Sequence, residues 1–190
     1  EFRRVLFRSN KSILDSLDKI ENDMIQGKRV LICVNSVDLA QELYRKLQSY
    51  NPKLIHGRFN TRDREQAEEG IEKSFLLIGT QSIEVSLDIS YDVLYTELAP
   101  FDSLLQRFGR VNRKGEKKEL SNVYIYNYDM NLNIYDYDIV NRTDTIISEI
   151  IHKDNSIVNE SKVSFYLDNV YLDIDMDKYN KHKTTLEIII

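Results

Sequence analysis

The segment LAPFDSLLQRFGRVNRKGE, residues 98–116, places three arginines and a glutamine among apolar residues typical of a protein core. On a helix of about 100° per residue, Gln106, Arg110 and Arg113 fall in one narrow sector, opposite the large apolar residues. Two guanidinium groups one turn apart suit a polyphosphate, because arginine clamps phosphate oxygens and a glutamine can orient a water. Gly109 has no side chain, so a ligand can approach the helix closely there. A solvated basic helix face is the alternative interpretation.

The elements that must position these groups alternate between short apolar runs and amphipathic segments. The patterns predict strands over 28–35, 53–56, 75–79, 92–98 and 122–127, and helices over 37–50, 62–72 and 98–116. Strands that alternate with helices favour right-handed crossovers and a parallel sheet covered on both faces. The stretches NSVD, HGRFN and GTQSIE each follow a predicted strand, so we expect them to meet at the carboxyl edge of the sheet.

Composition limits the class of protein. The chain has 190 residues, 42% hydrophobic and 30% charged, which is typical of one substantial globular core. No apolar run reaches the roughly 18 residues that a membrane-spanning helix needs, so we expect no membrane partner. The single cysteine, Cys33, lies in an apolar run and is predicted to be a small buried hydrophobe in a reducing compartment. These features favour a cytoplasmic protein.

Charge and composition divide the chain. The net charge is −5, but residues 1–120 hold 20 Lys and Arg against 19 Asp and Glu, and residues 121–190 hold 6 against 12. The first part therefore has no bulk basic surface, and any nucleic-acid contact must come from local groups. We predict three units: residues 1–9 as a cloning or assembly scar or unstructured, 10–128 as an α/β domain, and 129–190 as a smaller, mostly helical acidic linker or accessory region.

The spaced blocks LICVNSVDLAQELYRKL, IHGRFNTRDRE, GTQSIEVSLDISYDVLYTELAP and LLQRFGRVNRKG resemble motifs IV, IVa, V and VI of the second RecA-like domain of superfamily 2 helicases. The stretch that begins at Thr80 and runs through the arginine-rich segment is most similar to the type I CRISPR-associated helicase-nuclease family. The resemblance covers about residues 28–128. It implies a RecA-like fold, with a parallel sheet and helices on both faces.

The resemblance also implies roles for individual residues. Arg110 and Arg113 match arginine fingers that reach the ATP γ-phosphate, and Gln106 matches the phosphate-proximal position of the same motif. Asp88 matches an aspartate near the ribose, and with Gly109 it completes the predicted nucleotide side. The positions that match nucleic-acid contacts are Asn35, Ser36, Gly57, Arg64, Thr80 and Gln81.

Several of these polar residues also have a structural explanation, and Glu84 is assigned no chemistry. Read alone, His56 is better explained as structural, Asp88 and Thr80 suit a turn and a strand end as well as they suit a site, and Glu84 is an ion-pair candidate for Arg107. No metal site is predicted in this chain.

Two motifs are absent from the sequence. ATP hydrolysis of this kind needs a glycine-rich phosphate loop and a carboxylate that holds Mg²⁺, and a nuclease of the family's type needs a His-Asp doublet. We therefore expect the chain to be the second half of a helicase motor, inactive alone, with ATP and Mg²⁺ bound mainly by a first RecA-like domain.

The partners that the resemblance implies are single-stranded DNA, the first RecA-like and nuclease domains of the same full-length protein, and the CRISPR surveillance complex of antiviral defence. Two alternatives remain open: another superfamily 2 DNA or RNA helicase, and a non-catalytic RecA-like interaction module.

Overall fold

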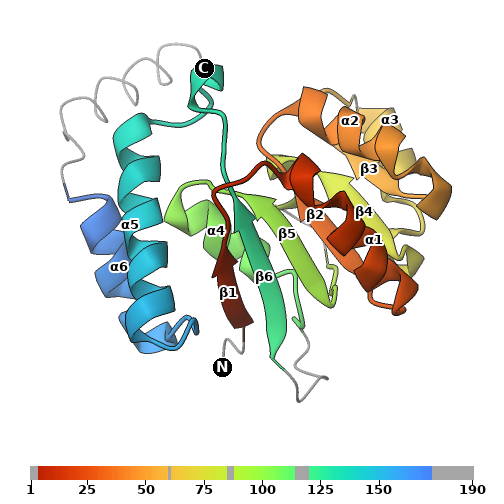
Figure 1. Ribbon diagram of the computed structural model, residues 1–190. Coiled ribbons are helices and arrows are strands. Elements are labelled where there is room, and N and C mark those ends of the chain that lie inside the picture. The colour runs from red at the N-terminus through yellow and green to blue at the C-terminus, as the bar shows by residue number, and fades with distance from the viewer. Residues whose placement is uncertain (1–3, 60, 85–87, 114–119, 173–190) are drawn as a thin grey trace, which may run out of the picture.

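The computed structural model describes residues 4–59, 61–84, 88–113 and 120–172, in which six parallel strands form one sheet of order β1-β6-β5-β2-β4-β3 (Figure 1). The strands are β1 Arg4–Arg8, β2 Val30–Cys33, β3 Lys53–Ile55, β4 Leu76–Gly79, β5 Val93–Glu97 and β6 Ser121–Tyr126. The helices are α1 Leu17–Ile25, α2 Val37–Lys46, α3 Thr61–Glu68, α4 Phe101–Phe108, α5 Tyr137–Lys153 and α6 Val163–Val170. The predicted α/β class, with a parallel sheet between helices and a helical segment after it, is confirmed.

The central strands have continuous apolar sequences because both faces of the sheet are buried. Central β2 pairs with β4 and β5 in matching register, so that Cys33 lies opposite Gly79 on one side and Thr96 on the other. Successive strand residues alternate between two core clusters: Leu31 faces one and Ile32 the other. A strand that is buried on both faces therefore has a mostly apolar sequence, without the alternation of apolar and polar residues seen in a half-exposed strand.

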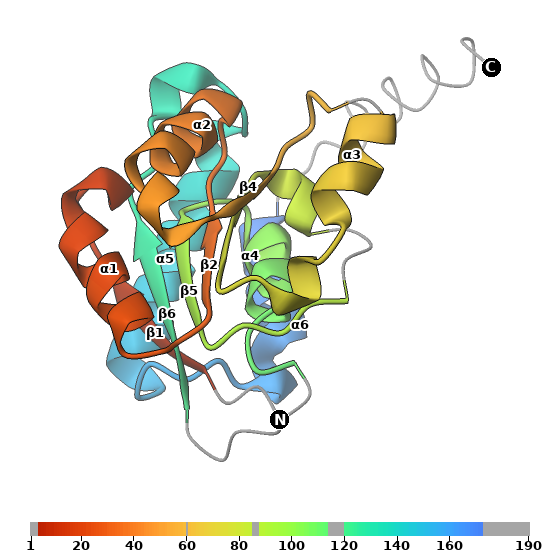
Figure 2. The ribbon, with the colours of Figure 1, turned by 90° about the vertical axis from the view of Figure 1, so that its right-hand side faces the viewer.

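Different helices cover the two faces (Figure 2). Helices α1 and α2 pack on one face through residues such as Ile20 and Leu43. Helices α4, α5 and α6 cover the other, where Phe101, Ile147 and Tyr166 share a single cluster. The predicted division at residue 128 stays a prediction, although α5 and α6 share their core with α4.

Helix α4 is shorter than the sequence predicts. It ends at Phe108, Gly109 is its C-cap, and Asn112 has a positive φ of 46°. The N–H of Tyr91 donates to the carbonyl of Arg110, and the N–H of Asn112 donates to the carbonyl of Tyr91. These bonds draw the chain out of the helix beside β5, so the prediction that Arg113 lies on the same helical face as Gln106 is wrong.

Residues 4–8 are structured, which corrects the prediction of an unstructured start for that part of 1–9. They form β1, which pairs in parallel with β6 and buries Leu6 in the core. Arg4 also donates from Nη2 to the carbonyl of Val111 at 2.6 Å. The sequence pattern does not predict this strand, because it is short and its two flanking arginines interrupt the apolar pattern. Helix α1 was likewise not predicted.

Gly79 lets three loops come close together at the carboxyl edge. A Cβ atom there would lie 2.5 Å from the Ile55 carbonyl and 2.5 Å from the Ile83 side chain. The absent side chain allows the N–H of Thr80 to donate to the Ile55 carbonyl at 3.1 Å. On the other side, the N–H of Val34 donates to the Gly79 carbonyl at 2.9 Å. The loops after β2, β3 and β4 are thereby tied to one another.

Within the described part of the chain, no helix combines the length and the apolar character that crossing a bilayer requires.

Candidate functional site

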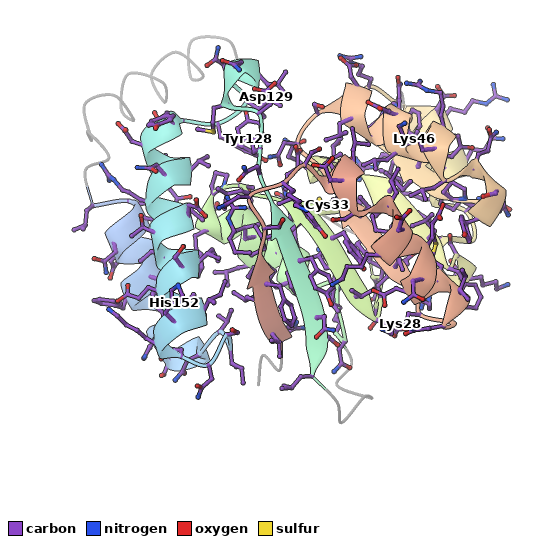
Figure 3. All side chains as sticks on the ribbon, in the orientation of Figure 1. Lys28, Cys33, Lys46, Tyr128, Asp129 and His152 are labelled. Carbon is purple, nitrogen blue, oxygen red and sulfur yellow. The ribbon has the colours of Figure 1, made fainter. Side chains whose placement is uncertain are left out.

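The carboxyl edge of the sheet gathers the polar stretches that the sequence predicts there. Asn35 follows β2, His56 follows β3, and Thr80 follows β4, and the parallel registers of these strands bring the three residues to the same edge. Tyr128 and Asp129 follow β6 at this edge as well (Figure 3). The predicted meeting of the NSVD, HGRFN and GTQSIE stretches is therefore confirmed.

The centre of this edge is Arg107, whose side chain is 0% exposed. A guanidinium group carries five N–H donors, and five acceptors surround this one. Nε donates to Glu84 Oε1 at 2.8 Å, and Nη1 donates to Thr96 Oγ1 at 2.9 Å and to the Glu97 carbonyl at 3.2 Å. Nη2 donates to Asn35 Oδ1 at 3.0 Å and to Tyr135 Oη at 3.2 Å. The predicted Glu84–Arg107 ion pair is confirmed, and every donor of this cation is satisfied internally.

Asn35 is buried inside the same network, not displayed at the surface. Its Nδ2 donates to the Leu98 carbonyl at 2.8 Å, and its backbone N–H donates to Glu97 Oε2 at 2.6 Å. Its own carbonyl accepts from Gln81 Nε2 at 3.1 Å. Both the side-chain amide and the backbone of Asn35 thus bond within the protein, and a direct nucleic-acid contact by this residue stays a prediction.

Burial shifts the ionisation of two groups under the network. It raises the pKa of Cys33 to about 12, although Arg107 lies close, so the thiol stays protonated and unreactive at neutral pH. This agrees with the prediction of a small buried hydrophobe. Burial also raises the pKa of Glu97, while the Asn35 N–H and Arg107 act in the opposite direction. The bonds to Glu97 therefore offset part of the cost of burying its carboxylate.

Thr80 and Gln81, directly after β4, differ in their exposure to solvent. Thr80 is buried, and its Oγ1 lies 3.3 Å from Ser82 Oγ. Gln81 is half-buried, and its Nε2 donates to the Asn35 carbonyl and, at 3.0 Å, to Tyr135 Oη. Of the two predicted contacts, Gln81 is the one within reach of a ligand at the surface.

Three residues of the predicted nucleotide side lie together. Arg110 Nη2 donates to the Glu84 carbonyl at 2.6 Å, and Arg113 Nη1 lies 3.4 Å from Asp88 Oδ1. Burial lowers the pKa of Arg110, the charge of Arg113 lowers it further, and Asp88 opposes the shift. Two guanidinium groups are therefore close enough to repel each other, and a bound anion would relieve this repulsion.

The other two residues of the predicted nucleotide side lie between Asp88 and Arg110 in the sequence. Gln106 is exposed on the last turn of α4, and Gly109 caps that helix directly before Arg110. A Cβ atom on Gly109 would lie 3.2 Å from the Gln106 carbonyl, which is a tight contact. The glycine thus serves the end of the helix, and nothing in the described residues places Gln106 beside Arg113.

The remaining predicted nucleic-acid contacts lie along the loops after β2 and β3. Ser36 is the N-cap of α2, and its Oγ accepts from the Leu39 N–H at 3.2 Å. Gly57 is exposed. Arg64, on α3, pairs with Glu68 at 2.7 Å on a partly exposed face. Of these, Gly57 and Arg64 offer accessible groups to a phosphate backbone.

His56 is buried and structural in character, as expected. Its ring lies 4.0 Å from the ring of Phe59, centroid to centroid, and burial lowers its pKa below the ordinary value. The neutral form is therefore favoured at neutral pH.

Tyr135 and the role of Arg107 as a hub were missed by the sequence analysis. Tyr135 belongs to the acidic, tyrosine-rich region that was predicted to pack or link, and its ring gives no motif signal. For Arg107 a signal existed, because it lies on the apolar side of the predicted helix, where a charge requires a buried partner.

No group of three or more His, Cys, Asp or Glu side chains suited to a metal occurs among residues 4–59, 61–84, 88–113 and 120–172.

Comparison with known proteins relates this edge to one family. Residues 26–116 match the family model described as CRISPR-associated nuclease/helicase Cas3, C-terminal. The CRISPR-associated helicase Cas3 of Thermoproteus tenax is 37% identical over 107 residues, which cover 53% of this chain and 18% of that protein. The chain therefore spans less than a fifth of the length of this relative.

Solved structures share the fold. The crystal structure of T. fusca Cas3-ATP has a TM-score of 0.75 and 19% sequence identity, over 96% of this chain and 26% of that one. A chain in the structure of a CRISPR RNA-guided surveillance complex, pre-nicking, has a TM-score of 0.69 and 20% identity, over 96% of this chain and 27% of that one.

Proposed function

Residues 26–116 form the second RecA-like domain of the CRISPR-associated Cas3 helicase family, and from this premise we propose that the chain is half of an ATP-driven motor that moves along single-stranded DNA. A first RecA-like domain of the same longer protein would bind most of the ATP and Mg²⁺, which fits the absence of a phosphate loop here. A nuclease domain and the CRISPR surveillance complex are the further proposed partners.

The observation that carries this proposal is the cluster of Arg110, Arg113 and Asp88. Arg110 is anchored through one Nη atom to the Glu84 carbonyl, and the guanidinium of Arg113 is close enough to lower its pKa. The nearby carboxylate, Asp88, is 84% exposed, so water screens it strongly. A triphosphate presented by the first domain would add negative charge beside the two guanidinium groups.

The two arginines would act late in the reaction. Charge spreads over the γ-phosphoryl oxygens as the bond to the leaving group breaks, and fixed guanidinium groups stabilise that charge without reorganisation. Arg110 is held at one end by its bond to the Glu84 carbonyl, so it is the better oriented of the two. Gln106 would orient the attacking water, Gly109 would allow close approach beside Arg110, and Asp88 would contact the ribose side.

The nucleic-acid track would run along the loops after β2, β3 and β4. Gly57, Arg64 and Gln81 carry accessible groups there, and we propose them as direct contacts to the DNA. Ser36 fixes the first turn of α2 beside the track. Asn35 and Thr80 are buried, so we propose that they support the loops that carry the accessible contacts.

The test is DNA-stimulated ATP hydrolysis by the full-length protein that carries this chain. Arg110→Ala, Arg110→Lys and Arg113→Ala should each lower turnover, because arginine fingers contribute about 10³–10⁵ in rate. Lysine should not rescue Arg110, since a point charge does not reproduce a planar fork. Arg45→Ala is the matched control, because Arg45 is an exposed arginine in the last turn of α2 and is not among the proposed contacts.

The results separate the candidate functions. Loss of turnover in the Arg110 and Arg113 variants, with normal folding and a normal Arg45 control, supports the motor. Equal stimulation by RNA would favour another superfamily 2 helicase. Full-length protein that binds DNA but hydrolyses no ATP would favour an interaction module.

A further inference from the structure

Tyr135 lies outside the stretch that matches the family model, yet its oxygen reaches the centre of the candidate site. It lies in the segment between β6 and α5, well after residue 116, where the family match ends. Its Oη accepts from Gln81 Nε2 at 3.0 Å and from Arg107 Nη2 at 3.2 Å. One phenolic oxygen is thus shared by the loop after β4 and by helix α4.

The segment that carries Tyr135 is itself firmly built. The ring of Tyr135 packs edge-on against Tyr128 with centroids 5.9 Å apart, and Tyr128 Oη accepts from the Ile134 N–H at 2.8 Å. Asn133 adopts a left-handed turn, and Asp136 caps α5 by accepting from Asp138 and Ile139. These contacts at the start of α5 therefore fix the position of the Tyr135 oxygen.

The bonds of Gln81 fix the direction of its amide. The Asn35 carbonyl can only accept, so the nitrogen of Gln81 must face inward, toward Asn35 and Tyr135. The two N–H groups of Gln81 then bond within the protein, and the carbonyl oxygen is left to accept from a hydrogen-bond donor of the nucleic acid, such as a base amino group. Without the oxygen of Tyr135, this amide would lose one of its two anchors.

Arg107 depends on the same oxygen. It is fully buried, and Tyr135 supplies one of its five acceptors, next to Asn35 Oδ1 on the same nitrogen. Burial raises the pKa of Tyr135, although Arg107 and Gln81 counteract this, so the phenol is protonated at neutral pH. Loss of the oxygen would leave a buried guanidinium N–H without its acceptor, which is costly.

We propose that Tyr135 is a positioning residue, whose oxygen holds Gln81 and Arg107 in the arrangement that binds single-stranded DNA and so couples the helical segment after β6 to the motor. This inference rests on the proposed function. It gives the acidic region a defined task beyond packing. A shift of α5 relative to the sheet would remove the oxygen from Gln81 and Arg107 at once.

The test compares Tyr135→Phe with Tyr137→Phe in the full-length protein. Phenylalanine keeps the ring contact with Tyr128 and removes only the oxygen, while Tyr137 lies two residues further on and is 63% exposed. ATP turnover is measured against single-stranded DNA concentration, and urea unfolding is followed in parallel. Tyr135→Phe should raise the half-stimulating DNA concentration about 10- to 100-fold, the usual range for a lost hydrogen bond to a charged group. Tyr137→Phe should match the wild type.

A double-variant cycle tests whether Tyr135 acts through Gln81. If it does, Gln81→Leu combined with Tyr135→Phe should need no more DNA than Gln81→Leu alone. Additive effects, or a Tyr135→Phe protein that is destabilised but has normal DNA dependence, would overturn the inference. If Arg110→Lys loses turnover while Tyr135→Phe behaves like Tyr137→Phe, the motor stands and the inference fails. A wild type without DNA stimulation overturns both.

Discussion

Arg107 and Arg113 belong to the same short segment, yet they have opposite surroundings. Arg107 is 0% exposed and donates to five acceptors, among them the buried carboxylate of Glu84. Arg113 has a side chain that is 44% exposed and lies 3.4 Å from Asp88, which is 84% exposed. Arg110 lies between them in sequence and in burial. One run of arginines thus contains a structural cation at one end and accessible cations at the other.

This contrast separates two uses of the same side chain. A guanidinium whose donors are all bonded to buried groups organises the fold, and a ligand could reach it only by breaking that network. A guanidinium at the surface contributes little to stability, but it can meet a charge that arrives from outside. Residue type and spacing alone do not distinguish the two, whereas burial does.

The largest stability effect is expected at Arg107. Arg107→Met should lower the free energy of unfolding of the 190-residue chain by about 3–5 kcal/mol, because the Glu84 carboxylate would be left buried without its partner. The measurement is urea unfolding followed by circular dichroism. The double variant Arg107→Met with Glu84→Leu should recover much of the loss, since both charges are then removed. If the Arg107→Met variant is as stable as the wild type, Arg107 does not stabilise the fold through its buried hydrogen bonds.

A smaller effect is expected at Asn35, compared with its neighbour Ser36. Asn35→Leu leaves the Leu98 carbonyl and one Arg107 N–H without their partners, at a cost of about 1–3 kcal/mol. Ser36→Ala removes only an N-cap bond, which contributes about 1 kcal/mol. Urea unfolding of both variants, without any nucleic acid, measures the difference. Equal, negligible losses would instead favour Asn35 as a surface contact.

Arg113 should matter little for stability. Arg113→Ala should change the free energy of unfolding by no more than about 1 kcal/mol, because its pair with Asp88 is exposed and screened by solvent. Asp88→Asn should behave in the same way. The check is urea unfolding at low and high salt, where the small difference between variant and wild type should shrink further. A loss as large as that of Arg107→Met would remove the contrast between the two arginines.

A modest pH effect is expected from His56. Burial lowers its pKa in the folded state below the ordinary 6.5, so the unfolded chain binds the proton more readily. The contribution of His56 to stability is therefore complete above pH 6.5 and falls as the pH drops through the folded pKa, with a slope of at most about 1.4 kcal/mol per pH unit. Unfolding midpoints between pH 7.5 and 5 should show a smaller decline in His56→Gln. An identical decline would assign the effect to other groups.

Much of the fold could be predicted from the sequence because it is repeated in simple patterns. Five of the six strands are short runs rich in apolar residues, and the helices between most of them favour the parallel arrangement. The strand at 4–8 is not predictable in this way, because it is short, arginines flank its apolar residues, and its pairing partner β6 lies more than a hundred residues away. Local pattern carries no information about so distant a pair.

The site was less predictable, since it depends on where each helix stops. The periodicity of residues 98–116 continues through Arg113, but the bonds between Tyr91 and the chain at Arg110 and Asn112 end the helix first. Likewise, Asn35 is polar and follows a strand, which suggests a displayed side chain. Its burial arises from Glu97 and Arg107, which lie 62 and 72 residues further along the chain.

We propose that Arg110 stabilises the transition state of phosphoryl transfer, while Arg107 stabilises the fold. The most direct measurement is the affinity of the full-length protein for ADP with aluminium fluoride, a mimic of the transferring phosphoryl group, compared with its affinity for ADP alone. Because a finger acts where charge develops, Arg110→Lys should weaken binding of the mimic by about 10³-fold or more and leave ADP binding and the unfolding midpoint unchanged. Normal binding of the mimic by Arg110→Lys, or a parallel loss of mimic binding, ADP binding and stability, would contradict the claim.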